Sequence, residues 1–264
     1  MKLQIVPAST GLSWVKLGVK TFFRQPLAMS GLFFMFMAVV SLLSVVPFIG
    51  TAISLGLVPA ATLGLMAASR EAVAGRFPMP VTLLTAFRSG ADRTRPMLVL
   101  GGLYAGALLL VLGLAALLGP AGGTPVALTD GEVTPEAMRS AFMSQGMWVA
   151  MLAYVPVLMA FWHAPALVHW HGVSPGKSLF FSAMACWRNK GAMLVYTLGW
   201  VGVFMLMGLV MSLLGAMLGG ASALNLIMYP MVLFMASMFH TSIYFTFRDS
   251  FDTGEPPELA DAAA

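Results

Sequence analysis

Charged residues are scarce in this chain of 264 residues: they make up 9% of the sequence, whereas apolar residues make up 59%. A soluble domain has about 25% charged residues, so this composition excludes a water-soluble protein of this length. The apolar residues also form long runs, which are typical of membrane-spanning helices. Cysteine occurs once, as Cys186, which excludes a disulfide within the chain.

Six stretches contain no Asp, Glu, Lys or Arg and are long enough to cross a bilayer core, which takes about 20 helical residues. We predict that these spans are Leu27–Val46, Phe48–Ser69, Met97–Leu118, Met147–Val168, Ala192–Leu218 and Leu224–Phe247. The links after the first and fifth spans are very short and predict tight helical hairpins. The expected fold class is therefore all-α: a polytopic transmembrane helical bundle of six spans arranged as three hairpins.

Groups that carry chemistry are also missing. Without a carboxylate inside a span, ion-coupled transport lacks its usual residues. The sequence has no Gly-rich phosphate loop, nucleophile elbow or zinc-protease helix. His169 and His171 would point about 200° apart on a helix, so they cannot bind one metal ion together. We therefore expect no enzyme, no cofactor and no metal site.

Basic residues lie almost entirely on one side of the predicted spans. Of the 14 Lys and Arg residues, only Arg139 falls on the other side. The positive-inside rule places the other thirteen in the cytoplasm. We therefore predict a multi-pass protein of a bacterial inner membrane, with both termini in the cytoplasm and a periplasmic loop at 119–146. Residues 1–248 form one transmembrane domain, and residues 249–264 form an acidic, disordered cytoplasmic tail.

A short amphipathic segment precedes each odd-numbered span. The first is Leu12–Arg24, the second opens at Pro80 and ends at Arg93–Pro96, and the third opens at Ser174–Pro175 and ends at Arg188–Gly191. Such segments are typical of helices that lie in the membrane interface. In the first segment, the polar face opposes an apolar face of Leu12, Val15, Val19, Phe22 and Phe23.

These segments predict either simple connectors at the headgroups or a cytoplasmic collar that binds anionic lipid or a partner. The sequence pI of about 9.5 follows from the topology, so no nucleic-acid binding is expected. The candidate contacts to anionic lipid are Lys16, Lys20, Arg24, Arg88, Arg93, Arg95, Arg188 and Lys190.

Small residues recur inside the spans. They occupy every fourth position of the second span, from Gly56 through Ala60 and Gly64 to Ala68, and the third span has Gly102 and Gly106. Such spacing predicts close approach of helix backbones.

Two histidines are predicted at a similar depth in the membrane. His163 lies eight residues before His171, and His240 lies eight residues before Arg248. At 1.5 Å per residue, both would sit about 12 Å from the cytoplasmic boundary. We predict that His163 and His240, with Tyr244 or Trp162 nearby, line one intramembrane polar site. The alternative is that each imidazole bonds a carbonyl that a proline has left without its helical donor.

Several blocks of the sequence resemble an uncharacterised betaproteobacterial family of six-span integral membrane proteins. The blocks are Leu3-Gln4-Ile5-Val6-Pro7-Ala8, Phe22-Phe23-Arg24-Gln25-Pro26, Phe161-Trp162-His163-Ala164-Pro165-Ala166 and Lys177-Ser178-Leu179-Phe180-Phe181-Ser182. The resemblance implies the same topology. It implies no activity and no functional residue, because none is established for that family.

Two functions remain open from the sequence. The first is a non-enzymatic inner membrane protein that organises lipid or assists a partner complex. Its expected ligands are anionic headgroups, and a protein partner or a second copy of the chain is the alternative. The second is a transporter or channel for a small neutral or weakly polar solute.

Overall fold

The computed structural model describes residues 2–47, 49–118, 128–129, 132–133, 139, 144–217 and 221–251. Within this part, six helical stretches are long and apolar enough to cross a membrane: Pro26–Ser44, Gly50–Val73, Ala91–Leu118, Gln145–His171, Lys190–Gly215 and Pro230–Ser250. These stretches confirm the predicted all-α, six-span fold. Most of the predicted acidic tail and most of the loop at 119–146 lie outside the described residues, whereas the first tail residues, Asp249 and Ser250, end the last helix.

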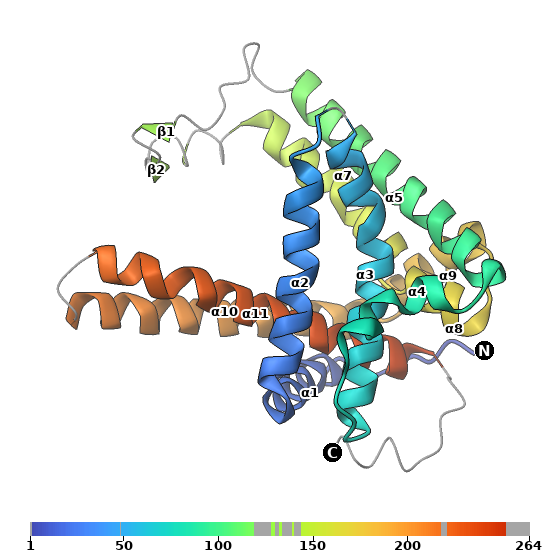
Figure 1. Cartoon of the computed structure of the whole chain (residues 1–264), viewed down its shortest axis with the longest axis horizontal. Helices are drawn as coiled ribbons and strands as arrows, with labels where there is room; N and C mark the ends of the chain where they lie inside the picture. The colour runs from blue at the N-terminus through green and yellow to red at the C-terminus, as the bar shows by residue number, and fades with distance from the viewer. Residues whose placement is uncertain are drawn as a thin grey trace.

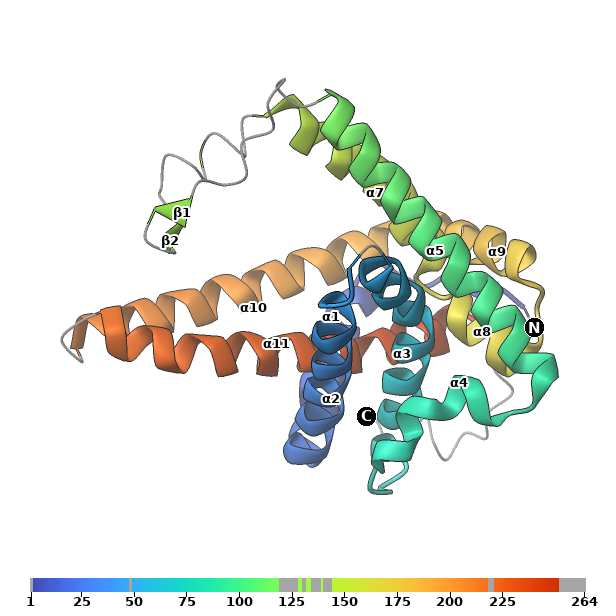
Figure 2. The ribbon, with the colours of Figure 1, turned by 45° about the horizontal axis from the view of Figure 1, so that its top comes forward.

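The spans form three hairpins. Helix α2 (Pro26–Ser44) pairs with α3 (Gly50–Val73), α5 (Ala91–Leu118) with α7 (Gln145–Phe161), and α10 (Lys190–Met217) with α11 (Ala221–Ser250). The hairpins meet at one end and diverge at the other, so that α10 and α11 run across Figure 1 while α2 and α3 stand upright. The turned view in Figure 2 shows the same divergence, with α5 and α7 as the third arm.

Shorter elements lie between the hairpins. They are α1 (Thr10–Arg24), the 3₁₀ helix η1 (Pro80–Leu84), α4 (Thr85–Arg88), α8 (Ala164–His171) and α9 (Pro175–Arg188), and two short strands, β1 (Leu128–Thr129) and β2 (Glu132–Val133), pair antiparallel. Helices α1 and α9 stand where amphipathic segments are predicted. The second predicted segment is different: the chain turns at Gly90, whose φ is +84°, and Arg93–Pro96 belongs to the first turns of α5.

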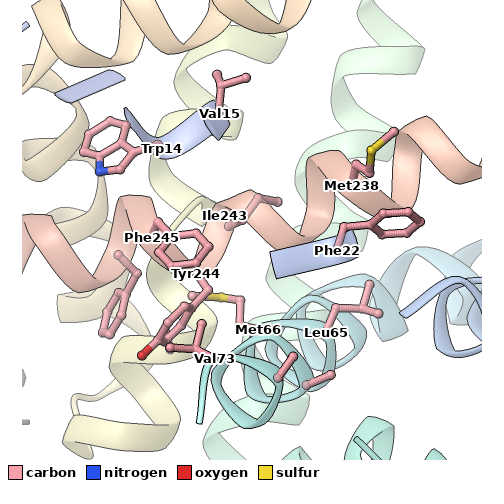
Figure 3. Packing of buried hydrophobic residues seen from close by; sticks show 14 of the residues in the cluster. Trp14, Val15, Phe22, Leu65, Met66, Val73, Met238, Ile243, Tyr244 and Phe245 are labelled. Carbon is pink, nitrogen blue, oxygen red and sulfur yellow. The ribbon is translucent and has the colours of Figure 1, made fainter. Parts of the chain in front are cut away.

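The core lies where the three hairpins meet. Trp14 of α1, Met66 of α3 and Phe245 of α11 are fully buried there, and Figure 3 shows these helices packed around them. The N-terminal segment reaches the same place, because Leu3 pairs with Phe251 and Gln4 N–H donates to Ser250 O at 2.9 Å. Both ends of the described chain therefore lie on one side of the spans, which we name the terminal side.

Glycines set the closest helix contacts. A Cβ added at Gly18 of α1 would collide with Ser242 of α11, and a Cβ added at Gly101 of α5 would collide with the Gly56 carbonyl of α3. Close packing at Gly56 agrees with the predicted stripe in the second span. In the third span the prediction was wrong, since Gly102 and Gly106 have nothing within 4 Å and Gly101 makes the contact.

The predicted apolar face of α1 packs against the protein only in part. Leu12 and Phe23 are exposed at 45% and 65%, whereas Val15 and Phe22 are buried as expected. The buried residues of α1 are Gly11, Trp14, Val15, Gly18, Thr21 and Phe22. Glycine stands beside large apolar side chains on this face, because α10 packs directly against the α1 backbone at Gly11 and α11 does so at Gly18.

Candidate functional site

A partly open cavity of about 250 Å³ lies between spans two, three, four and six, where the three hairpins meet. Its walls combine apolar rings with a few polar groups, and no Asp, Glu, Lys or Arg is among them. The lining residues are Val58, Pro59, Thr62, Tyr104, Tyr154, Leu158, Phe161, Trp162, Pro165, Phe239, His240 and Ile243.

His240 supplies an unused nitrogen to this cavity. Its Nδ1 lies 2.8 Å from the carbonyl oxygen of Ala236, and a carbonyl can only accept, so Nδ1 carries the proton and donates. In the neutral ring Nε2 is therefore an acceptor, and no residue in the described part of the chain bonds it. The rings of Phe33 and Phe239 hold the imidazole, with centroids at 5.0 and 5.6 Å.

Two tyrosines from spans three and four supply the complementary group. Tyr104 and Tyr154 both line the cavity, and their side chains lie close to each other. Each phenol carries an O–H that can donate a hydrogen bond to a group in the cavity. The Tyr104 ring is fixed by Phe161, with ring centroids 5.0 Å apart. Sequence reasoning missed both residues, although each is the single tyrosine of its predicted span.

His163 lies outside the cavity lining, in a hydrogen-bonded network behind Trp162. The Thr246 hydroxyl donates to Ile243 O at 2.7 Å, so its oxygen accepts from Trp162 Nε1 at 3.0 Å and from His163 Nε2 at 3.3 Å. His163 is 0% exposed. A buried, bonded imidazole of this kind fixes the packing of spans four and six.

Span four is broken next to this network. Helix α7 ends at Phe161 and α8 begins at Ala164, so His163 N–H does not bond the carbonyl of Met159 as a continuous helix would require. Ser182 of α9 fills the gap: His163 N–H donates to its Oγ at 2.9 Å, and this Oγ donates to Met159 O at 2.7 Å. The break thus has its backbone groups satisfied by a neighbouring helix, as buried non-helical backbone in a membrane requires.

Cys186 also faces the break. Its Sγ lies 3.7 Å from Met159 O and 3.9 Å from His163 Nδ1. It is only 3% exposed, and burial raises the pKa of its thiol to about 12. The thiol therefore stays protonated near neutral pH, which makes it a packing residue and not a nucleophile.

The structure brings together only two of the four residues predicted for the polar site. His240 and Trp162 line the cavity together, whereas His163 and Tyr244 do not. Tyr244 packs against Trp170, with ring centroids 6.3 Å apart, and Figure 3 shows it beside α3. The alternative for the histidines was wrong: His240 bonds Ala236 O and His163 bonds a threonine, so neither bonds a carbonyl freed by a proline.

The predicted lipid contacts are mostly on the surface. Arg93 is the exception, because it is half-buried and donates to Val168 O at 3.2 Å, at the end of α8. Lys190 Nζ lies over the Trp187 ring, 5.5 Å from its centroid. The exposed members are Lys16, Lys20, Arg24, Arg88, Arg95, Arg188 and Lys190. Among the described residues, no group of three His, Cys, Asp or Glu side chains could hold a metal ion.

Fold and composition define the class: a multi-pass α-helical membrane protein. The chain is 38% identical to a probable inner membrane protein of Burkholderia thailandensis, over 270 residues that cover 100% of this chain and 99% of the relative. It therefore belongs to that family of inner membrane proteins, as the sequence resemblance predicted. No protein-family model matches the chain, and no solved structure matches it.

Proposed function

We propose that this inner membrane protein is non-enzymatic and organises anionic lipid through its terminal side, which we place in the cytoplasm. The observation that carries the proposal is the outer face of α1. Lys16, Lys20 and Arg24 are exposed at four-residue spacing, so they lie on one face of the helix. Phe23 is exposed beside them, at 65%.

A helix face with both cations and apolar side chains is typical of a helix at the membrane interface. Its apolar groups enter the acyl region, and its cations bind the phosphates of the headgroups. The opposite face fixes the helix in place. Gly11 and Gly18 pack against α10 and α11, and Trp14 Nε1 donates to Asp249 Oδ2 at 2.8 Å. A rigidly mounted basic face can bind headgroups without ordering the helix first, which lowers the entropic cost of binding.

Native mass spectrometry of the protein released from bilayers of phosphatidylethanolamine and phosphatidylglycerol tests the proposal. The variant K16Q/K20Q/R24Q should retain at least about fivefold less phosphatidylglycerol, because each basic residue at the surface contributes about 1 kcal/mol. The variant K16R/K20R/R24K keeps the charge and should retain the wild-type amount. Equal lipid retention by all three proteins would contradict the proposal, and a co-purified protein lost only in the glutamine variant would favour a partner complex.

A second candidate, a transporter or channel for a small neutral or weakly polar solute, is favoured by the break in span four beside the cavity. Discontinuous spans often form the binding sites of transporters. Proteoliposomes that contain the protein should then take up glycerol or urea faster than empty liposomes, and His240→Ala should change that rate. Uptake equal to that of empty liposomes would exclude these solutes.

A further inference from the structure

We propose that the cavity between the three hairpins is a binding site for one small, neutral, hydroxyl-bearing molecule with an apolar body. The site goes beyond lipid organisation at the basic face, since its walls come from α3, α5, α7, α8 and α11 and not from α1. If the second candidate function holds, this is where its solute binds. The proposed site requires only that the ligand binds, so a negative transport assay would not contradict it.

The polarity of the walls defines the ligand. His240 Nε2 accepts a hydrogen bond, and the phenols of Tyr104 and Tyr154 can donate one. A hydroxyl group is the simplest ligand group that can donate to the first and accept from the second. The remaining walls are mainly apolar, including Leu158, Phe239 and Ile243, and suit a hydrocarbon body.

The absence of charged side chains from the lining argues that the ligand is neutral. An ion moved into such a site would lose its hydration without gaining a counter-charge. Size is limited as well, because the cavity volume is about 250 Å³. This space is below the usual range for drug-sized ligands, which favours a smaller molecule.

The cavity also differs from the polar network beside it. The polar hydrogens of His163, Thr246 and Trp162 all have partners within the protein, so that network has no donor to offer a ligand. Trp162 contributes only its ring to the cavity wall. His240 is the one imidazole in the described residues that both lines the cavity and has an unpaired nitrogen.

Photolabelling tests the site in the full-length protein in lipid nanodiscs. The probe is a hexanol that carries a diazirine, and adducts are mapped by mass spectrometry of peptides. We expect saturable adducts on the cavity residues of α5, α7 and α11. Excess benzyl alcohol should compete, whereas ethylbenzene, which has a similar shape and no hydroxyl, should compete about fivefold to tenfold less well, as one lost hydrogen bond predicts.

His240→Phe keeps a ring between Phe33 and Phe239 but removes the acceptor, and should lower labelling of the cavity about fivefold to tenfold. His240→Gln retains an acceptor and should keep most of the labelling. K16Q/K20Q/R24Q should label like the wild type, which separates this site from the lipid proposal.

Equal competition by benzyl alcohol and ethylbenzene would overturn the proposal, and so would adducts spread evenly over lipid-facing peptides. Because the competition is measured on the wild type, the result is decisive even if His240→Phe does not fold.

Discussion

His163 and His240 differ in how their ring nitrogens are used. The first is 0% exposed and bonds Thr246, which Trp162 also bonds, so three side chains depend on one another. The second uses only Nδ1, in a bond to a carbonyl of its own helix. His163 therefore holds spans four and six together, whereas His240 can be replaced with only a small loss of stability.

We predict that His163→Ala lowers the free energy of unfolding by about 2–4 kcal/mol, because it leaves a cavity and removes a buried hydrogen bond. His240→Ala should cost about 1 kcal/mol. Thermal unfolding in detergent, followed by circular dichroism, compares the two variants. Equal losses of thermal stability would contradict the different roles assigned to the two imidazoles.

Sequence reasoning could estimate the depth of these histidines but not their direction. Depth follows from residue separation along a helix, whereas direction depends on an unbroken helical register. The break at Trp162–His163 ends that register, and Ser182, which bridges it, is 19 residues further along the chain. Trp162 and His240 could be selected from the sequence, but Tyr104 and Tyr154 become visible only once spans three and four are packed together.

Cys186 should be almost inert in the folded protein. Its pKa rises from 9.0 to about 12 because of burial, so at pH 8 its thiolate fraction is roughly a thousandfold smaller than that of an unfolded thiol. A maleimide should label the protein in denaturing detergent but not in its native state. From about pH 9 to 12 only the unfolded thiol loses its proton, so the free energy of unfolding should fall as pH rises through that window. Rapid native labelling at pH 8 would contradict this burial.

At the scale of the helix, α1 depends on Gly18. A methyl group there would meet the Cα and Cβ of Ser242, and a backbone atom cannot move as a flexible side chain can. Gly18→Ala should therefore destabilise the protein by about 1–3 kcal/mol and lower its retention of anionic lipid, because α1 is displaced. The matched control is Gly31→Ala in α2, where nothing lies within 4 Å and alanine favours the helix. Thermal unfolding and native mass spectrometry measure both effects, and equal behaviour of the two variants would show that α1 does not need this contact.

The spans were predictable because a single property, the absence of charge over a long stretch, determines them. The buried face of α1 was not predictable in full. Glycine counts as neither apolar nor polar in a helical pattern, yet Gly11 and Gly18 lie at the centre of the contact with α10 and α11. Phe23, on the predicted apolar face, is exposed, since an apolar residue at the membrane interface can face lipid instead of protein.

On the scale of the whole molecule, the three hairpins share one core on the terminal side and separate beyond it (Figures 1 and 2). Burial follows this shape: 56% of the span in α11 is buried, but only 17% of the span in α10. A membrane removes the need to bury the outer faces, since lipid is as apolar as the side chains on them. The packing that specifies the structure is therefore concentrated next to the basic residues.

The orientation of this core in the membrane is the last prediction. Thirteen of 14 basic residues lie on the terminal side, so the positive-inside rule puts the core, the basic face of α1 and both termini in the cytoplasm. Ser13 is exposed on α1, and Gln145 is exposed at the start of α7, on the opposite side of the membrane. Both are uncharged, so replacing either with cysteine leaves the charge balance unchanged.

Because Cys186 is expected to be unreactive, the introduced cysteine is the thiol that a maleimide should label in each variant. In spheroplasts, a membrane-impermeant maleimide should label Gln145→Cys at once and Ser13→Cys only after the membrane is broken. The wild type should stay unlabelled in both conditions. The reverse pattern would place the basic face in the periplasm, where it could not meet the anionic lipids of the cytoplasmic leaflet, and the proposed lipid function would fail with it.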